Sequence, residues 1–160
     1  MTTPDHLPTA PTVVVSGVAS DSHTWNLVFL QLLVEELGYP VVNLGPCVPD
    51  EVLVERCRRI RPGLVVIGTV NGHGGQDALR VIERLRGVPE LATTPVVIGG
   101  KLGVSGDVSG HTPALLAAGF DAVFEDGGEA IADFRRFMRA IPPAGRPALS
   151  RVAQGSEATA

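Results

Sequence analysis

The chain has 160 residues, of which 44% are hydrophobic and 19% are charged, and its net charge is −4. This length predicts a single domain with a core of its own, and the composition is typical of globular proteins. The acidic balance excludes nucleic acid as an expected partner, and no apolar run reaches the roughly 18 residues of a membrane span.

Residues 1–11 are rich in threonine and proline and lack the basic start and apolar stretch of a secretory signal. We expect a disordered leader there, one domain over residues 12–141, and a disordered tail over residues 142–160. Cys47 and Cys57 match no zinc-binding spacing, so two free thiols in a reducing compartment are expected. The predicted location is therefore cytoplasmic.

Five short apolar runs predict strands, at residues 12–16, 40–44, 64–67, 95–98 and 121–124. Each is followed by a stretch with helical spacing, at residues 25–37, 49–61, 76–86, 113–119 and 127–139. Glycine-rich loops are expected over residues 68–75 and 101–112. Five strand–helix units with right-handed crossovers predict an α/β fold, a doubly wound parallel sheet. We expect the flavodoxin-like strand order 2-1-3-4-5.

The expected helix over residues 25–37 is apolar almost all round. A helix of this kind is covered on more than one side. Two interpretations stay open: the helix is buried deep in the domain, or a ligand or partner covers its second face.

Polar and glycine-rich segments follow the first, third and fourth strands, whose carboxyl ends lie side by side in this strand order. They contain Asp21-Ser22-His23, then Thr69 among four glycines, then Gly99-Gly100. A His can offer a neutral imidazole to a metal while an Asp holds its other ring nitrogen. Simpler alternatives stay open, namely an Asp–His pair without a metal, a strand-end cap at Thr69 and a plain turn at the two glycines.

Other ligands of this fold class are excluded by missing motifs. The chain has no Gly-x-x-x-x-Gly-Lys-Ser/Thr phosphate loop, and residues 17–21 do not fit a Gly-x-Gly-x-x-Gly dinucleotide fingerprint. The third strand is followed by Gly68-Thr69, where a phosphorylation site of the response-regulator type would need an aspartate.

The three segments together resemble the pattern of cobalamin-binding domains, which is Asp-x-His-x-x-Gly, then Ser/Thr-x-Leu, then Gly-Gly. Asp21-Ser22-His23, Thr69-Val70 and Gly99-Gly100 occupy these positions. The sequence is most similar to the small subunits of glutamate mutase (methylaspartate mutase), with further support from residues 41–45, 72–74 and 131–134. The resemblance covers about residues 12–140.

The resemblance implies a role for each matching residue. His23 would be the lower axial ligand of the cobalt in adenosylcobalamin, and Asp21 would accept a hydrogen bond from its other ring nitrogen. Thr69 would bond the displaced nucleotide tail of the cofactor. The remaining expected cofactor contacts are Ser22, Val70 and Gly72, with Gly99 and Gly100 lining the slot for the tail.

The sequence departs from the pattern at Asn26, which stands where the first motif has glycine. Asparagine tolerates unusual backbone angles but adds a side chain. It either caps the helix, bonds the nucleotide tail, or narrows the slot. Val70 stands where leucine is usual, and Asn71 stands where the mutase small subunits often have an aromatic residue.

By resemblance, the chain is expected to act with a separate catalytic large subunit in converting L-glutamate to threo-3-methylaspartate, and to be inactive alone. A homodimer and a heterotetramer are both compatible with that expectation. Two alternatives remain: a cobalamin carrier or sensor module for methyl transfer or regulation, and a flavodoxin-like interaction domain that no longer binds cobalamin. No membrane partner is expected.

Overall fold

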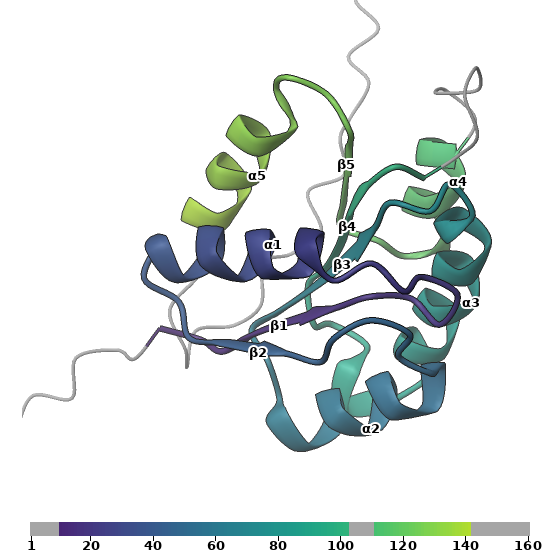
Figure 1. The fold of residues 1–160 in the computed structure, drawn as a ribbon. Helices are drawn as coiled ribbons and strands as arrows, with labels where there is room; N and C mark the ends of the chain where they lie inside the picture. Colours follow the sequence, from purple (N-terminus) through teal and green to yellow (C-terminus); the bar gives the residue numbers. More distant parts are fainter. Residues whose placement is uncertain (1–9, 103–110, 142–160) are drawn as a thin grey trace, which may run out of the picture.

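The computed structural model describes residues 10–102 and 111–141. A five-stranded parallel sheet runs through the centre, in the order β2-β1-β3-β4-β5 (Figure 1). Its strands are β1 (Val13–Ser16), β2 (Val41–Asn43), β3 (Leu64–Thr69), β4 (Val96–Gly100) and β5 (Ala122–Glu125). The predicted flavodoxin-like fold with strand order 2-1-3-4-5 is confirmed.

Helices cover both faces of the sheet. They are α1 (Trp25–Glu36), α2 (Asp50–Ile60), α3 (Gly74–Arg86), α4 (His111–Ala118) and α5 (Ala130–Arg139), with a short 3-10 turn, η1 (Pro89–Leu91), that the sequence did not predict. Helices α1 and α5 pack on one face, and α2, α3 and α4 pack on the other. Within the described part of the chain, no helix is long and apolar enough to cross a membrane.

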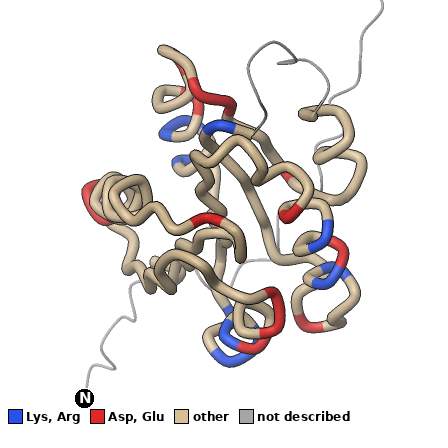
Figure 2. The backbone as a smooth tube through the Cα atoms, turned by 45° about the vertical axis from the view of Figure 1, so that its right-hand side comes forward, with Lys and Arg blue, Asp and Glu red and all other residues tan. Residues whose placement is uncertain are grey.

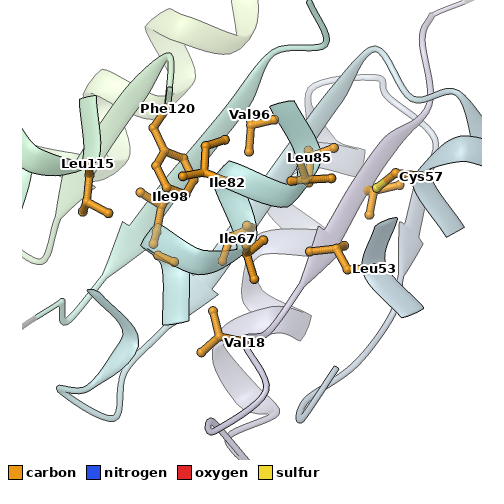
Figure 3. Close-up of a cluster of buried hydrophobic side chains, with 14 of the residues drawn as sticks. Val18, Leu53, Cys57, Ile67, Ile82, Leu85, Val96, Ile98, Leu115 and Phe120 are labelled. Atoms are coloured by element: carbon orange, nitrogen blue, oxygen red, sulfur yellow. The ribbon is translucent and has the colours of Figure 1, made fainter. Parts of the chain in front are cut away.

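The strands are apolar without alternation because both faces of the sheet are covered. Val13, Val14 and Val15 are all fully buried, with Val14 in the core beneath α2 and α3 and its two neighbours in the core beneath α1 and α5. Figure 3 shows the first of these cores, which includes Cys57. Burial raises the pKa of the Cys57 thiol to about 12, so it stays protonated. Both Cys47 and Cys57 are free thiols, as predicted.

Two strands run further than the sequence predicted. β3 continues through Thr69 and β4 through Gly100, with Gly68 paired to Gly99 and Thr69 to Gly100. Helix α3 then begins at Gly74, so the predicted loop over residues 68–75 is wrong and shrinks to residues 70–73. Glycine is disfavoured in strands, so the sequence predicts loops at these residues. Pairing with a neighbouring strand uses backbone groups only and needs no side chain.

Most of the predicted leader and the whole predicted tail lie outside the described residues. Pro11 is described and is buried, packed against the backbone of Gly63, where a Cβ atom would lie 2.3 Å from the Cβ of Pro11. Most of the long loop predicted over residues 101–112 also lies outside. The domain boundaries therefore stay a prediction.

Helix α1 is buried on one side only. Leu27, Leu33 and Val34 point into the core. The opposite side exposes four large apolar side chains: Trp25 at 64%, Val28 at 49%, Phe29 at 46% and Leu32 at 59%. The charged residues of α1, Glu35 and Glu36, lie at its C-terminal end (Figure 2). The deeply buried interpretation is wrong for the chain by itself, because the second face of α1 meets solvent.

Arg86, at the end of α3, ties together the segments before β4 and β5. Its guanidinium donates to the carbonyl oxygens of Gly119 at 2.8 Å and Thr94 at 2.6 Å, and it pairs with Asp121 at 2.9 Å. The same Asp121 carboxylate accepts the backbone N–H of Val96 at 2.8 Å. These bonds hold the amino ends of β4 and β5 in register.

We predict that Arg86→Ala lowers the free energy of unfolding by roughly 3 kcal/mol, because several carbonyl oxygens lose the guanidinium donor and the Asp121 carboxylate loses its charged partner while keeping the backbone N–H of Val96. The matched control is Arg59→Ala, which removes an exposed i,i+4 pair with Glu55 and is expected to cost less than about 1 kcal/mol. Urea unfolding at neutral pH measures both. Equal losses in the two variants would contradict this role of Arg86.

Candidate functional site

The site is centred on the carboxylate of Asp21, in the loop between β1 and α1. The residue is 1% exposed. Oδ1 accepts the backbone N–H of His23 at 3.0 Å and lies 2.7 Å from its ring Nδ1. Oδ2 accepts the hydroxyl of Thr69 and the backbone N–H of Val70, both at 2.8 Å. The buried carboxylate is therefore hydrogen-bonded on both oxygens.

These bonds decide the charge of Asp21. Burial by itself would raise the pKa of the carboxyl group, but hydrogen bonds from the backbone of Val70, from His23 and from the Thr69 hydroxyl favour the ionised form more strongly. The pKa is lowered to about 2. Asp21 is thus a carboxylate at neutral pH, and it can only accept hydrogen bonds.

The tautomer of His23 follows from this partner. Because Asp21 is an acceptor, Nδ1 of the neutral ring carries the proton and donates it to the carboxylate. Nε2 then keeps a free lone pair. The side chain is 47% exposed, at the carboxyl edge of the sheet. His23 is therefore oriented with one unprotonated ring nitrogen on a half-exposed side chain, an arrangement that suits a metal ligand.

The strand-end residue Thr69 is fully buried and is packed closely by two glycines. A Cβ atom on Gly74 would lie 2.2 Å from the Thr69 side chain, and one on Gly100 would lie 2.0 Å from the Thr69 carbonyl oxygen. Gly100 also has a φ of 111°, a conformation that side chains disfavour. The hydroxyl of Thr69 points at Asp21, a partner that the sequence did not suggest.

A second set of bonds joins the same two loops. The side-chain amide of Asn71 donates to the carbonyl and hydroxyl oxygens of Ser20, at 3.2 and 3.1 Å, and its Oδ1 accepts the backbone N–H of His73 at 2.8 Å. Asp77 of α3 accepts the backbone N–H of Ser20 at 3.1 Å. Sequence reasoning missed Asn71 and Asp77. An asparagine just after a strand, able to bond the backbone two residues on, was the available signal for Asn71.

The structure brings some predicted residues together and leaves others at the margin. Asp21, His23, Thr69 and Val70 form one connected cluster. The loop after β2 joins it, because the backbone N–H of Cys47 donates to the carbonyl oxygen of Asp21 at 2.9 Å. The other predicted contacts are Ser22, which is exposed, Gly72, which has a φ of 78° in the loop after β3, and Gly99 and Gly100, which end β4.

Asn26 does not cap helix α1. Thr24 is the N-cap residue, and no side-chain capping hydrogen bond is formed within the described part of the chain. Asn26 is instead buried, at 7% exposure, and its Oδ1 has no hydrogen-bond partner among the described residues. Of the three alternatives raised by the sequence, capping is therefore wrong.

The chemistry of this edge suits a metal that brings most of its own ligands. Among residues 10–102 and 111–141, no three His, Cys, Asp or Glu side chains gather around a common point. The edge offers one oriented imidazole nitrogen beside strand ends that carry glycine. A cobalt ion held in a corrin ring takes one nitrogen from the protein side, and the orphaned Asn26 acceptor offers a further polar contact. The described residues therefore fit a corrinoid.

Comparison with known proteins agrees with this geometry. A family model described as B12 binding domain matches residues 11–135. A glutamate mutase sigma subunit from Halobacterium salinarum is 30% identical over 128 residues, which are 78% of this chain and 85% of the relative. A glutamate mutase sigma subunit from Fusobacterium nucleatum is 24% identical over 118 residues, 72% of this chain and 85% of the relative.

Solved structures share the fold. A cobalamin-binding protein from Desulfitobacterium hafniense superposes with a TM-score of 0.65 at 19% identity, covering 81% of this chain and 58% of its own. This chain thus spans less than two thirds of that protein. A response regulator from Chloroflexus aurantiacus has a TM-score of 0.57 at 17% identity, covering 81% of this chain and 98% of its own. The fold alone does not separate these two classes.

We predict that Asp21→Asn removes a pH-dependent part of the stability. Because the folded pKa of about 2 lies below the ordinary value of 3.8, the carboxylate stabilises the fold above about pH 4, and this contribution is lost as the pH falls towards 2. At pH 7, the free energy of unfolding of the variant should be about 2 kcal/mol lower than that of the wild type. Between pH 4 and pH 2, the free energy of unfolding of the variant should change less than that of the wild type.

Urea unfolding at several pH values measures this difference. Asp133→Asn, which changes an exposed carboxylate on α5, is the matched control and should follow the wild-type profile. A wild-type chain whose stability falls in parallel with that of Asp21→Asn below pH 4 would show that Asp21 does not carry the effect.

Proposed function

The chain belongs to the B12 binding domain family, and on that premise we propose that it is the cobalamin-binding small subunit of an adenosylcobalamin-dependent mutase. The reaction we propose is that of glutamate mutase, after which its relatives are named: the interconversion of L-glutamate and threo-3-methylaspartate. The observation that carries the proposal is the Asp21–His23 pair, which leaves one imidazole nitrogen free at the edge of the sheet.

In this proposal, Nε2 of His23 is the lower axial ligand of the cobalt. Asp21 keeps the proton on Nδ1 and raises the basicity of the coordinating nitrogen. Thr69 and the backbone of Val70 hold Asp21 in place. They would therefore act on the cobalt only through Asp21 and His23. The cofactor supplies the radical chemistry when it is bound, and the protein contributes binding and orientation.

The other expected contacts are assigned by their position at the same edge. Ser22 is exposed beside His23, and Gly72 lies in the loop that follows Val70. Gly99 and Gly100 end β4 without side chains, which lets an extended group approach the backbone closely. We propose that the nucleotide tail of the cofactor lies over these glycines.

A catalytic large subunit is the proposed partner. The relatives are sigma subunits, a name that implies at least one other subunit. The exposed apolar side of α1 begins at Trp25, two residues after His23, so it is continuous with the proposed cofactor edge. A partner that covers the cofactor would also bury Trp25, Phe29 and Leu32, which are costly to leave in water.

We predict that the purified chain binds cobalamin with a histidine nitrogen on cobalt and that His23→Ala does not form this bond. Paramagnetic resonance of the Co(II) form measures it directly. When only the histidines carry ¹⁵N, the nitrogen superhyperfine splitting of the Co(II) signal should change from the ¹⁴N pattern to the ¹⁵N pattern. His73→Ala, which removes an exposed imidazole at the start of α3, is the control and should behave as wild type.

An unchanged splitting on labelling would mean that the nitrogen comes from the cofactor's own base, and the axial-ligand proposal would fail. Absence of any binding of hydroxocobalamin in an equilibrium titration would favour the remaining alternative, an interaction domain without cobalamin.

We further predict that the chain, mixed with a glutamate mutase large subunit and adenosylcobalamin, forms methylaspartate from glutamate. Neither protein alone should do so, and His23→Ala should lower the rate at least tenfold, because its cobalt lacks a protein ligand. The assay follows methylaspartate by chromatography. Tight cobalamin binding without turnover with the large subunit would favour the carrier or sensor alternative.

A further inference from the structure

Asn26 is a buried polar side chain with an unsatisfied hydrogen-bond acceptor among the described residues. It lies in the first turn of α1 and points into the protein, at 7% exposure. Its Oδ1 is buried and finds no partner within residues 10–102 and 111–141. A buried acceptor without a donor destabilises a fold, and such a group calls for an explanation, for example a ligand that is bound in the working protein.

The surface opposite Asn26 is a patch of sheet without side chains. Gly68 of β3 and Gly99 of β4 are direct partners in the sheet. A Cβ atom on Gly68 would lie 3.3 Å from Nδ2 of Asn26 and 2.9 Å from Cδ1 of Leu30. Asn26, Leu27 and Leu30 therefore rest on the bare backbone of Gly68, and the ends of these three side chains cover it.

Helices α1 and α5, which cover this face of the sheet, are close together at one end and apart at the other. Helices α1 and α5 meet at their C-terminal ends, where Arg135 pairs with Glu36 at 3.7 Å and the Tyr39 hydroxyl donates to the Met138 carbonyl at 2.9 Å. Towards the carboxyl edge of the sheet, their first turns diverge (Figure 1). Gly68 lies beneath side chains of α1, and Gly99 lies beside Phe124 of β5, on the face of the sheet that α1 and α5 cover.

We propose that the side-chain amide of Asn26 recognises the nucleotide tail of cobalamin, with Oδ1 accepting a hydrogen bond from a hydroxyl group of the tail's ribose. This inference rests on the proposed function. Entry of the tail onto Gly68 and Gly99 displaces the ends of Asn26 and Leu30 and gives Oδ1 its missing donor. Asn26 is then a specificity residue, which distinguishes corrinoids with a nucleotide tail from those without one.

The test compares hydroxocobalamin with cobinamide, which has the corrin ring and cobalt but no ribose, phosphate or base. We expect Asn26→Ala to weaken the binding of cobalamin about tenfold and to leave the binding of cobinamide unchanged. Asn26→Gly should do the same. Val52→Ala, which truncates an exposed apolar side chain on α2, is the control and should bind both corrinoids as wild type does.

Folding is measured in parallel by urea unfolding of the chain without cofactor. Asn26→Ala should be at least as stable as wild type, because it removes an unsatisfied acceptor. Loss of cobalamin affinity without loss of stability supports recognition of the tail.

Three results would overturn the inference and leave the proposed function standing. Cobalamin binding by Asn26→Gly that equals or exceeds wild-type binding would mean that the side chain only narrows the slot. An equal loss for cobinamide would mean general damage to the site. Equal affinity of the wild-type chain for both corrinoids would mean that the tail is not recognised. If the wild-type chain binds neither corrinoid, the proposed function itself fails, and this inference fails with it.

Discussion

The site depends on one buried negative charge. A carboxylate with 1% exposure is stable only if hydrogen bonds replace the water that it has lost, and Asp21 obtains them from two loops. Satisfying that charge brings the end of β3 against the loop after β1. It also fixes the direction in which His23 faces. The orientation of His23 thus follows from the hydrogen bonds that the buried Asp21 carboxylate needs in place of water.

Much of this arrangement could be predicted from sequence because the relevant rules are local or topological. Runs such as Val13 to Val15 indicate buried strands, and parallel strands place their carboxyl ends at one edge. The Asp21–His23 contact followed from a spacing of two residues in a turn. Gly68 and Gly99 were harder, because their pairing in the sheet depends on register, which local strand preference does not reveal.

What escaped prediction involves side chains that meet across long stretches of sequence. The hydroxyl of Thr69 could have pointed to a ligand, to its own backbone or to Asp21, and nothing local in the sequence indicates a bond to a carboxylate 48 positions away. Asn71 bonds Ser20 across 51 positions. The outer side of α1 was ambiguous for another reason, since apolar composition alone cannot tell whether the covering surface belongs to the same chain.

Arg86 and Asp21 act at opposite ends of the same sheet, on different strands. The arginine joins segments at the amino ends of β4 and β5, whereas the carboxylate organises the carboxyl ends of β1 and β3. Both rims of the sheet therefore contribute to stability, whereas the candidate ligand residues lie at one rim only. Because Oδ1 of Asn26 has no hydrogen-bond partner among the described residues, a substitution at this position can change the candidate site without breaking a bond of that oxygen on which the scaffold depends.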